Sequence, residues 1–123
     1  LLIADILFQN EDYEKAKSTY QEILTNSSGL NFEMARVSLA YVYEAMEDYK
    51  KAIDLLKKAV AIEPDNHMLH FSLAVAYQAI GEFEKTKEHS KKAIKINPKH
   101  IMSYNNKGFA LQQLKKVVLG KNK

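Results

Sequence analysis

Apolar and polar residues alternate along this chain with the period of amphipathic helices. In the segment 49–62 the apolar residues recur three and four positions apart, so they share one helix face, and charged residues occupy the other. This pattern predicts a helix with one buried face and one solvated face. The apolar face consists of Ala52, Ile53, Leu56, Ala59 and Val60, and the polar face of Lys50, Lys51, Asp54, Lys57 and Lys58.

The pattern returns every 34 residues. The segment 62–64 (Ile-Glu-Pro) recurs at 96–98 as Ile-Asn-Pro, and Met34, Met68 and Met102 keep the same spacing. The segment 48–52 (Asp-Tyr-Lys-Lys-Ala) has an earlier copy at 12–16 (Asp-Tyr-Glu-Lys-Ala), which lies 36 residues upstream. We therefore expect two extra residues in a first loop at about 26–31, whose Asn, Ser and Gly residues favour turns.

Each period divides into two helices. Pro64 and Pro98 cannot continue a helix, and polar or glycine-containing breaks at 47–48 and 81–82 end the first helix of each pair. The apolar segment 117–120 does not predict a second helix in the last unit. We expect seven helices, at about 1–9, 12–25, 32–46, 49–62, 67–80, 83–96 and 101–115.

The residues that recur together resemble the tetratricopeptide repeat family, which combines Leu, a small residue, Tyr, an aromatic, Ala and Pro at set spacings. The resemblance implies an all-α fold, a right-handed superhelical solenoid of antiparallel helix pairs. Arg36 and His70 stand where the family prefers a large aromatic, and Ser90 stands where Tyr20 supplies one. The matching residues include Leu39, Ala40, Tyr43, Tyr49, Ala52, Ala59 and Pro64 in one repeat, and Leu73, Ala74, Tyr77, Gly81, Phe83, Ala93 and Pro98 in the next.

We expect one tetratricopeptide-repeat domain over residues 1–123, which is a usual domain size. Its repeats are predicted at 1–32 (incomplete at the N-terminus), 33–66, 67–100 and 101–123 (incomplete). Because the chain begins with Leu1 and its last repeat is incomplete, we expect it to be a segment of a longer protein.

The first helices carry a second apolar face beyond the one that packing explains. Met34, Val37 and Tyr41 form it, and later repeats copy it. In the family this face lines a concave groove, so the resemblance implies a peptide-binding groove here. The predicted groove residues are Met34, Val37, Tyr41, Glu44, Met68, Phe71, Val75, Gln78, Met102, Asn105, Phe109 and Gln112.

Two interpretations of this face stay open. Large apolar residues in a row, with flexible Met among them, favour the binding of an apolar or amphipathic peptide. Alternatively, the curvature of the solenoid or further repeats cover the face. Glu44, Gln78, Gln112 and Gln113 are either hydrogen-bonding partners of a peptide backbone or solvated rim residues.

Some members of the family grip the C-terminal carboxylate of chaperones with Lys, Asn and Arg. A carboxylate needs such cations for charge-assisted hydrogen bonds. The matching positions here contain no basic residue in either of two registers, so we do not expect this ligand. They are Leu1, Asp5, Ser38, Met68 and Ser72, or Val37, Tyr41, Ser72, Met102 and Asn106.

Other chemistry finds little support. His67 and His70 lie three residues apart and could ligate a metal only with a third ligand on the same face. No standard ligand motif supplies one, so we interpret His67, His70 and His100 as surface histidines. The net charge of +3 is too small to indicate nucleic-acid binding, and no apolar stretch is long enough for a membrane span. No catalytic motif or cofactor motif is present, so we expect neither an enzyme nor a cofactor.

The sequence therefore predicts a protein-binding scaffold. The absence of cysteine is compatible with a cytoplasmic location. The alternative is a structural spacer or self-association segment of a larger assembly, because open repeat ends would expose apolar edges through which copies of the chain associate.

Overall fold

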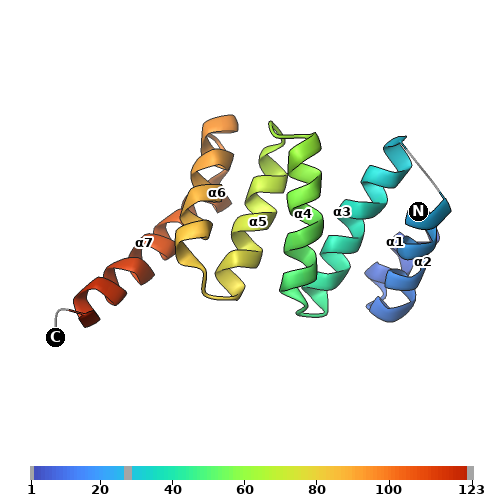
Figure 1. Cartoon of the computed structure of the whole chain (residues 1–123), viewed down its shortest axis with the longest axis horizontal. Coiled ribbons are helices and arrows are strands. Elements are labelled where there is room, and N and C mark those ends of the chain that lie inside the picture. The colour runs from blue at the N-terminus through green and yellow to red at the C-terminus, as the bar shows by residue number, and fades with distance from the viewer. Residues whose placement is uncertain (1, 27–28, 122–123) are drawn as a thin grey trace. The chain divides into compact units, whose positions relative to one another are not determined.

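The computed structural model describes residues 2–26 and 29–121, and over these residues the chain is all-α (Figure 1). The chain divides into two compact units, Leu1–Ala59 and Val60–Lys123, with the division inside α4. Over the described ranges the helices are α1 (Leu2–Gln9), α2 (Tyr13–Asn26), α3 (Gly29–Ala45), α4 (Tyr49–Ile62), α5 (His67–Ala79), α6 (Phe83–Ile96) and α7 (Ile101–Lys121).

In the first unit, α2 packs against both α1 and α3. Alanines without exposed surface let the backbones approach closely, and the ring of Tyr20 is buried among them. The predicted amphipathic pattern of α4 is confirmed, because its five charged residues are exposed. Of its apolar face, Val60 is half-buried, and the buried members are Ala52, Ile53, Leu56 and Ala59.

In the second unit, α6 packs against both α5 and α7. Thr86 and Ser90 of α6 are fully buried, and the preceding repeat has the apolar residues Ala52 and Leu56 at the equivalent positions. The Thr86 hydroxyl donates to the Glu82 carbonyl oxygen at 3.1 Å, and the Ser90 hydroxyl donates to the Thr86 carbonyl oxygen at 2.7 Å. Both hydroxyls are thus satisfied by their own helix, so burying them leaves no unpaired donor.

The first helix of each pair ends in the same hydrogen-bonded turn. Glu47 has a φ of 62°, its N–H donates to the Glu44 carbonyl at 3.0 Å, and the N–H of Asp48 donates to the Tyr43 carbonyl at 2.8 Å. This is a Schellman motif, in which the residue after the helix adopts the left-handed conformation. The corresponding residues, Glu11 and Gly81, have φ values of 61° and 79°, so the predicted breaks at 47–48 and 81–82 are confirmed.

Two predicted boundaries were wrong. The first loop is shorter than expected, because α2 reaches Asn26 and α3 already begins at Gly29; Ser27 and Ser28 lie outside the described residues. The last helix does not end near 115 but continues to Lys121. Nothing between 115 and 119 breaks a helix, and a missing second-helix pattern does not end the first one. None of the helices in the described ranges is long and apolar enough to span a membrane.

Candidate functional site

The predicted groove residues of the first unit lie along α3. Met34 is 48% exposed, whereas Val37, Tyr41 and Glu44 are half-buried. The stripe on α3 therefore has an accessible apolar edge beside a more protected row. This exposure is what a peptide-binding surface requires, although it does not identify a ligand.

A cavity of about 250 Å³ opens beside Tyr41 in the first unit. Side chains from three helices line this cavity. Of these side chains, the groove prediction had named only Tyr41. A repeat offset of 36 residues places Asp5 at the position equivalent to Tyr41, and this signal could have found the α1 side of the cavity. The lining residues are Asp5, Phe8 and Gln9 of α1, Tyr20 of α2, and Ser38 and Tyr41 of α3.

Tyr20 anchors the Asp5 carboxylate in this cavity, because its hydroxyl donates to Asp5 Oδ1. Burial is the main cause that raises the pKa of Tyr20 to about 12; the hydrogen bond to Asp5 acts in the same direction, and the Ser38 side chain acts against them. Tyr20 therefore keeps its proton at neutral pH and remains a hydrogen-bond donor.

In the second unit the groove residues come from α5 and α7. Met68 and Met102 are 41% and 58% exposed, and Phe109 is also exposed. Phe71 and Val75 are half-buried, and the Phe71 ring meets the His100 ring edge-on, with centroids 4.8 Å apart. Asn105 and Gln112 are exposed, so the α7 part of the stripe is more open than the α5 part.

Two polar groove residues have a buried oxygen without a hydrogen-bond partner. They are Glu44 and Gln78, and in each the atom is Oε1. Burial also raises the pKa of Glu44 to about 7. Because buried acceptors are normally paired, these two residues are not simple solvated rim residues. Gln112 by contrast is exposed, and Gln113 is half-buried.

The prediction of a surface histidine was wrong for His70, which is only 4% exposed. It occupies a position where the repeat favours a large aromatic, and its ring stacks on His89 with centroids 5.6 Å apart. Its Nε2–H donates to the Pro64 carbonyl at 2.8 Å, and its Nδ1 lies 3.4 Å from His89 Nδ1. The Tyr77 ring also stacks on His89, with ring centroids 5.6 Å apart.

The other two histidines, His67 and His100, are half-buried. His67 Nε2 lies 3.2 Å from Asn97 Nδ2, and His100 Nδ1 lies 2.7 Å from Ser103 Oγ. Within the described ranges, no three potential metal ligands gather in one place. These rings thus contribute to packing and to helix-end hydrogen bonds.

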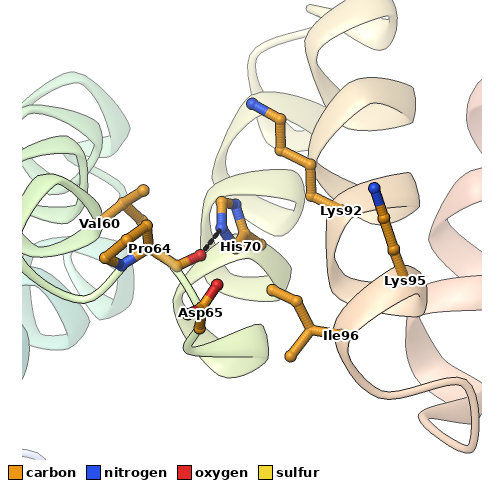
Figure 2. Close-up of a pocket in the computed structure, with 7 residues that line it drawn as sticks. All are labelled: Val60, Pro64, Asp65, His70, Lys92, Lys95 and Ile96. Carbon is orange, nitrogen blue, oxygen red and sulfur yellow. Dashed lines mark hydrogen bonds between the residues drawn. The ribbon is translucent and has the colours of Figure 1, made fainter.

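A larger cleft of about 550 Å³ lies on another surface of the second unit (Figure 2). Figure 2 shows the long side chains of Lys92 and Lys95 on one helix, across the cleft from Val60 and Pro64. Lys92 pairs with Glu88 at 3.4 Å. The sequence did not predict this cleft, because residues that meet from separate helices produce no periodic pattern along the chain. Its lining consists of Val60, Pro64, Asp65, His70, Lys92, Lys95 and Ile96.

Comparison with known families decides the classification. The family described as TPR repeat matches residues 40–81, and the family described as tetratricopeptide repeat matches residues 1–28 and 69–100. The chain belongs to the tetratricopeptide repeat family. Members of this family are protein-interaction modules. A search of curated proteins gives no significant match.

Solved structures of tetratricopeptide domains share the fold of this chain. The Sgt2 domain from Aspergillus fumigatus has a TM-score of 0.84 at 16% identity, covering 96% of this chain and 78% of that one. The C-terminal domain of a putative FK506-binding protein from Plasmodium falciparum has a TM-score of 0.77 at 25% identity, covering 93% and 85%. The second domain of human RPAP3, in complex with the HSP70 peptide SGPTIEEVD, has a TM-score of 0.78 at 13% identity, covering 87% and 88%.

Proposed function

We propose that this tetratricopeptide chain is a scaffold that binds an apolar or amphipathic peptide of a partner protein along its predicted groove residues. The observation that carries the proposal is the repeated exposure of methionine. Met34, Met68 and Met102 recur at the repeat period, and each exposes more than two-fifths of its surface. Large apolar side chains that recur at the repeat period and are exposed favour an interaction surface, and methionine adapts its shape to varied partners.

The unpaired oxygens of Glu44 and Gln78 support the same proposal. Each lies one turn beyond the apolar row of its own helix. A peptide N–H that reached either oxygen would remove the cost of leaving a buried acceptor unpaired, which is about 1–3 kcal/mol. Apolar burial would supply affinity, and these polar groups would set the register of the peptide.

The test begins with a 12-residue peptide selected for binding from a random display library. Phe71→Ala and Tyr41→Ala are expected to weaken its binding at least about tenfold in titration calorimetry, because each removes an aromatic contact. Both variants should keep the circular dichroism spectrum of the parent chain. Lys57→Ala, on the exposed face of α4, serves as the matched control and should bind normally.

The groove assignment is wrong if both aromatic variants lose helicity or melt far below the parent chain, since the rings would then belong to the core. Full binding by well-folded Phe71→Ala and Tyr41→Ala variants would place the peptide elsewhere. The cleft of Figure 2 would then be the next surface to examine with the same peptide.

A second candidate function is self-association, which the apolar residues of α7 favour. Leu111, Val117, Val118 and Leu119 are all exposed. Exposed apolar side chains that gather in one patch usually mark an interaction surface or an aggregation hazard, and three of these four are consecutive. Light scattering across a concentration series distinguishes the two functions. A concentration-dependent dimer that Val118→Lys abolishes supports self-association, whereas a constant monomer that binds the selected peptide supports the scaffold.

A further inference from the structure

We propose that the cavity beside Tyr41 in the first unit binds a cationic side chain, lysine or arginine, of the partner peptide. The six residues that form this site are Asp5, Phe8, Gln9, Tyr20, Ser38 and Tyr41. The assignment rests on the proposed function, because the cation would come from the same partner. It adds the chemical class of one anchor residue, which the apolar stripe alone does not give.

Charge is the first argument. Of the six lining residues, Asp5 alone is charged, so the site has one negative charge and no cation of its own. Two cations of this unit that do not line the cavity form ion pairs elsewhere: Arg36 binds Glu33 at 3.2 Å, and Lys17 binds Glu14 at 3.0 Å. An ammonium or guanidinium group in the cavity would form a charge-assisted hydrogen bond with the carboxylate.

The aromatic lining is the second argument. Phe8, Tyr20 and Tyr41 contribute rings from three helices to a cavity of about 250 Å³. The face of an aromatic ring attracts a cation, and the attraction grows when the cation is desolvated. The stem of a lysine or arginine is apolar and packs against such rings while its head stays polar. Rings and carboxylate together therefore favour a long cationic side chain over a short one.

The hydrogen bond from Tyr20 is the third argument, because it holds the carboxylate in place before any ligand arrives. Tyr20 is buried and donates to Asp5 Oδ1. An ionised carboxylate accepts several hydrogen bonds, so the Tyr20 bond leaves acceptor capacity for a ligand. A group fixed in advance loses less conformational entropy on binding.

Competing ligands fit this cavity less well. An acidic side chain would face the Asp5 charge without a cation to neutralise it. A purely apolar side chain would cover the carboxylate and desolvate it without a compensating bond, which is costly. The sign of the charge therefore selects a cation.

The test uses a small probe and needs no partner. N-acetylarginine methylamide is titrated into the ¹⁵N-labelled full chain, with N-acetylnorleucine methylamide as the apolar comparison. The amide signals of residues 5, 8, 9, 38 and 41 should shift together with the arginine probe and much less with norleucine. Asp5→Asn keeps the acceptor for Tyr20 and should weaken arginine binding at least about fivefold.

Glu14→Gln is the matched control, because it removes the same charge from an exposed site on α2 that does not line the cavity. It should bind the arginine probe as the parent chain does. Phe8→Leu provides a second variant, which keeps apolar volume but removes a ring. It should lower arginine binding and leave any norleucine response unchanged.

Several results would overturn the assignment. They are shifts scattered over the chain, equal responses to both probes, or an equal loss of binding in Asp5→Asn and Glu14→Gln. If Asp5→Asn fails to fold, an unchanged arginine response in Phe8→Leu has the same meaning. A localised arginine response together with full peptide binding by Phe71→Ala, which does not line the cavity, would keep the cation site and reject the groove. Peptide binding through the groove without an arginine response would do the reverse.

Discussion

Glu11, Glu47 and Gly81 occupy the same position of the helix-ending turn, but only one of them is glycine. The left-handed conformation costs a residue with a side chain about 1–2 kcal/mol, and glycine avoids this cost. Because glycine also loses more conformational freedom on folding, part of the advantage is cancelled. At residue scale, only the turn at Gly81 therefore has the residue that adopts this conformation at the lowest cost.

Exchanging residues at this position should change stability in opposite directions. Glu47→Gly is expected to raise the free energy of unfolding by about 0.5–1 kcal/mol, and Gly81→Ala to lower it by about 1 kcal/mol, as measured by urea denaturation. A Cβ at Gly81 would meet no atom within 4 Å, so any loss in Gly81→Ala comes from the backbone and not from a clash. Equal stabilities for Gly81→Ala and the parent chain would contradict this account.

Glu44 should make the chain less stable as the pH rises. Its pKa is raised to about 7 from an ordinary value of 4.5, so between these values the native state holds a proton that the unfolded chain has released. Stability contributed by the protonated form is lost across this window. Glu44→Gln, which places at 44 the residue that occurs at 78 and 112, should gain about 1 kcal/mol at pH 8 after allowance for solvent screening and almost nothing at pH 4. An equal gain at both pH values would contradict the titration argument.

His89 should act in the opposite direction. Burial is the main cause that lowers its pKa to about 4 from 6.5, so between these values the unfolded chain binds a proton that the native state excludes. Stability is then full above pH 6.5 and falls as the pH drops toward 4. His89→Gln should remove about 1–2 kcal/mol of this acid-dependent loss, seen as a flatter dependence of the unfolding free energy on pH. A parallel shift at all pH values would indicate lost ring stacking instead.

At the scale of the element, α7 shows which part of a long helix stabilises the second unit. Ser103 and Ala110 are fully buried in it, whereas residues 115–120 are exposed. The structural contribution of the helix therefore lies in its first half.

Truncation after Lys115 should change the unfolding free energy by less than about 1 kcal/mol, because residues 116–120 are exposed and exposed residues contribute little. Ala110→Leu, by contrast, inserts volume into a packed contact and should cost about 1–3 kcal/mol. Both changes can be compared by thermal and urea denaturation. A large loss on truncation would mean that the second half of α7 is structurally required.

The helices illustrate what a sequence can and cannot predict. Pro64, Pro98 and Gly81 mark chain positions where a helix cannot continue, so the predicted boundaries next to them lie within two residues of the observed ones. At the start of α3 and near the end of α7, Gly29 and Gly120 lie inside the helix and do not end it, and both boundaries were misplaced. The burial of His70 was also predicted wrongly, because the prediction followed the polarity of histidine and not its place at a position where the repeat favours a large aromatic.

The functional surfaces depend on contacts that no local pattern records. The groove residues follow the helical period, so the sequence could propose them. The cavity beside Tyr41 needs Asp5 and Tyr20 to meet from separate helices, and the cleft of Figure 2 needs Asp65 and Ile96 to lie at one opening. These sites emerged only from tertiary packing.

At the scale of the whole molecule, a shared fold does not imply a shared ligand. The human RPAP3 domain shares this fold and binds the acidic peptide SGPTIEEVD. Fold alone does not carry a ligand over, because function depends on the site. At the positions that the family resemblance matches to carboxylate-binding residues, this chain has residues such as Asp5, Ser38 and Met68.

If cations at the matched positions decide the ligand, the peptide SGPTIEEVD should bind this chain more weakly than it binds the RPAP3 domain, because its carboxylate would lack charge-assisted hydrogen bonds. Titration calorimetry of both proteins under the same buffer conditions measures the difference. Comparable affinities would show that the chain grips a carboxylate through residues outside the matched positions, and would reopen the assignment of the ligand class.

The lysine-rich exposed face of α4 has a consequence for how separate molecules meet. Lys50, Lys51, Lys57 and Lys58 all project into solvent, against a single aspartate on that face, and the net charge of the chain is positive. Like charges on approaching molecules repel, and salt shortens the range of this repulsion to about 8–10 Å at 0.1–0.15 M. In colloidal terms, the second virial coefficient should be more positive at low ionic strength, so added salt would promote contact between the apolar faces that these lysines help to keep apart.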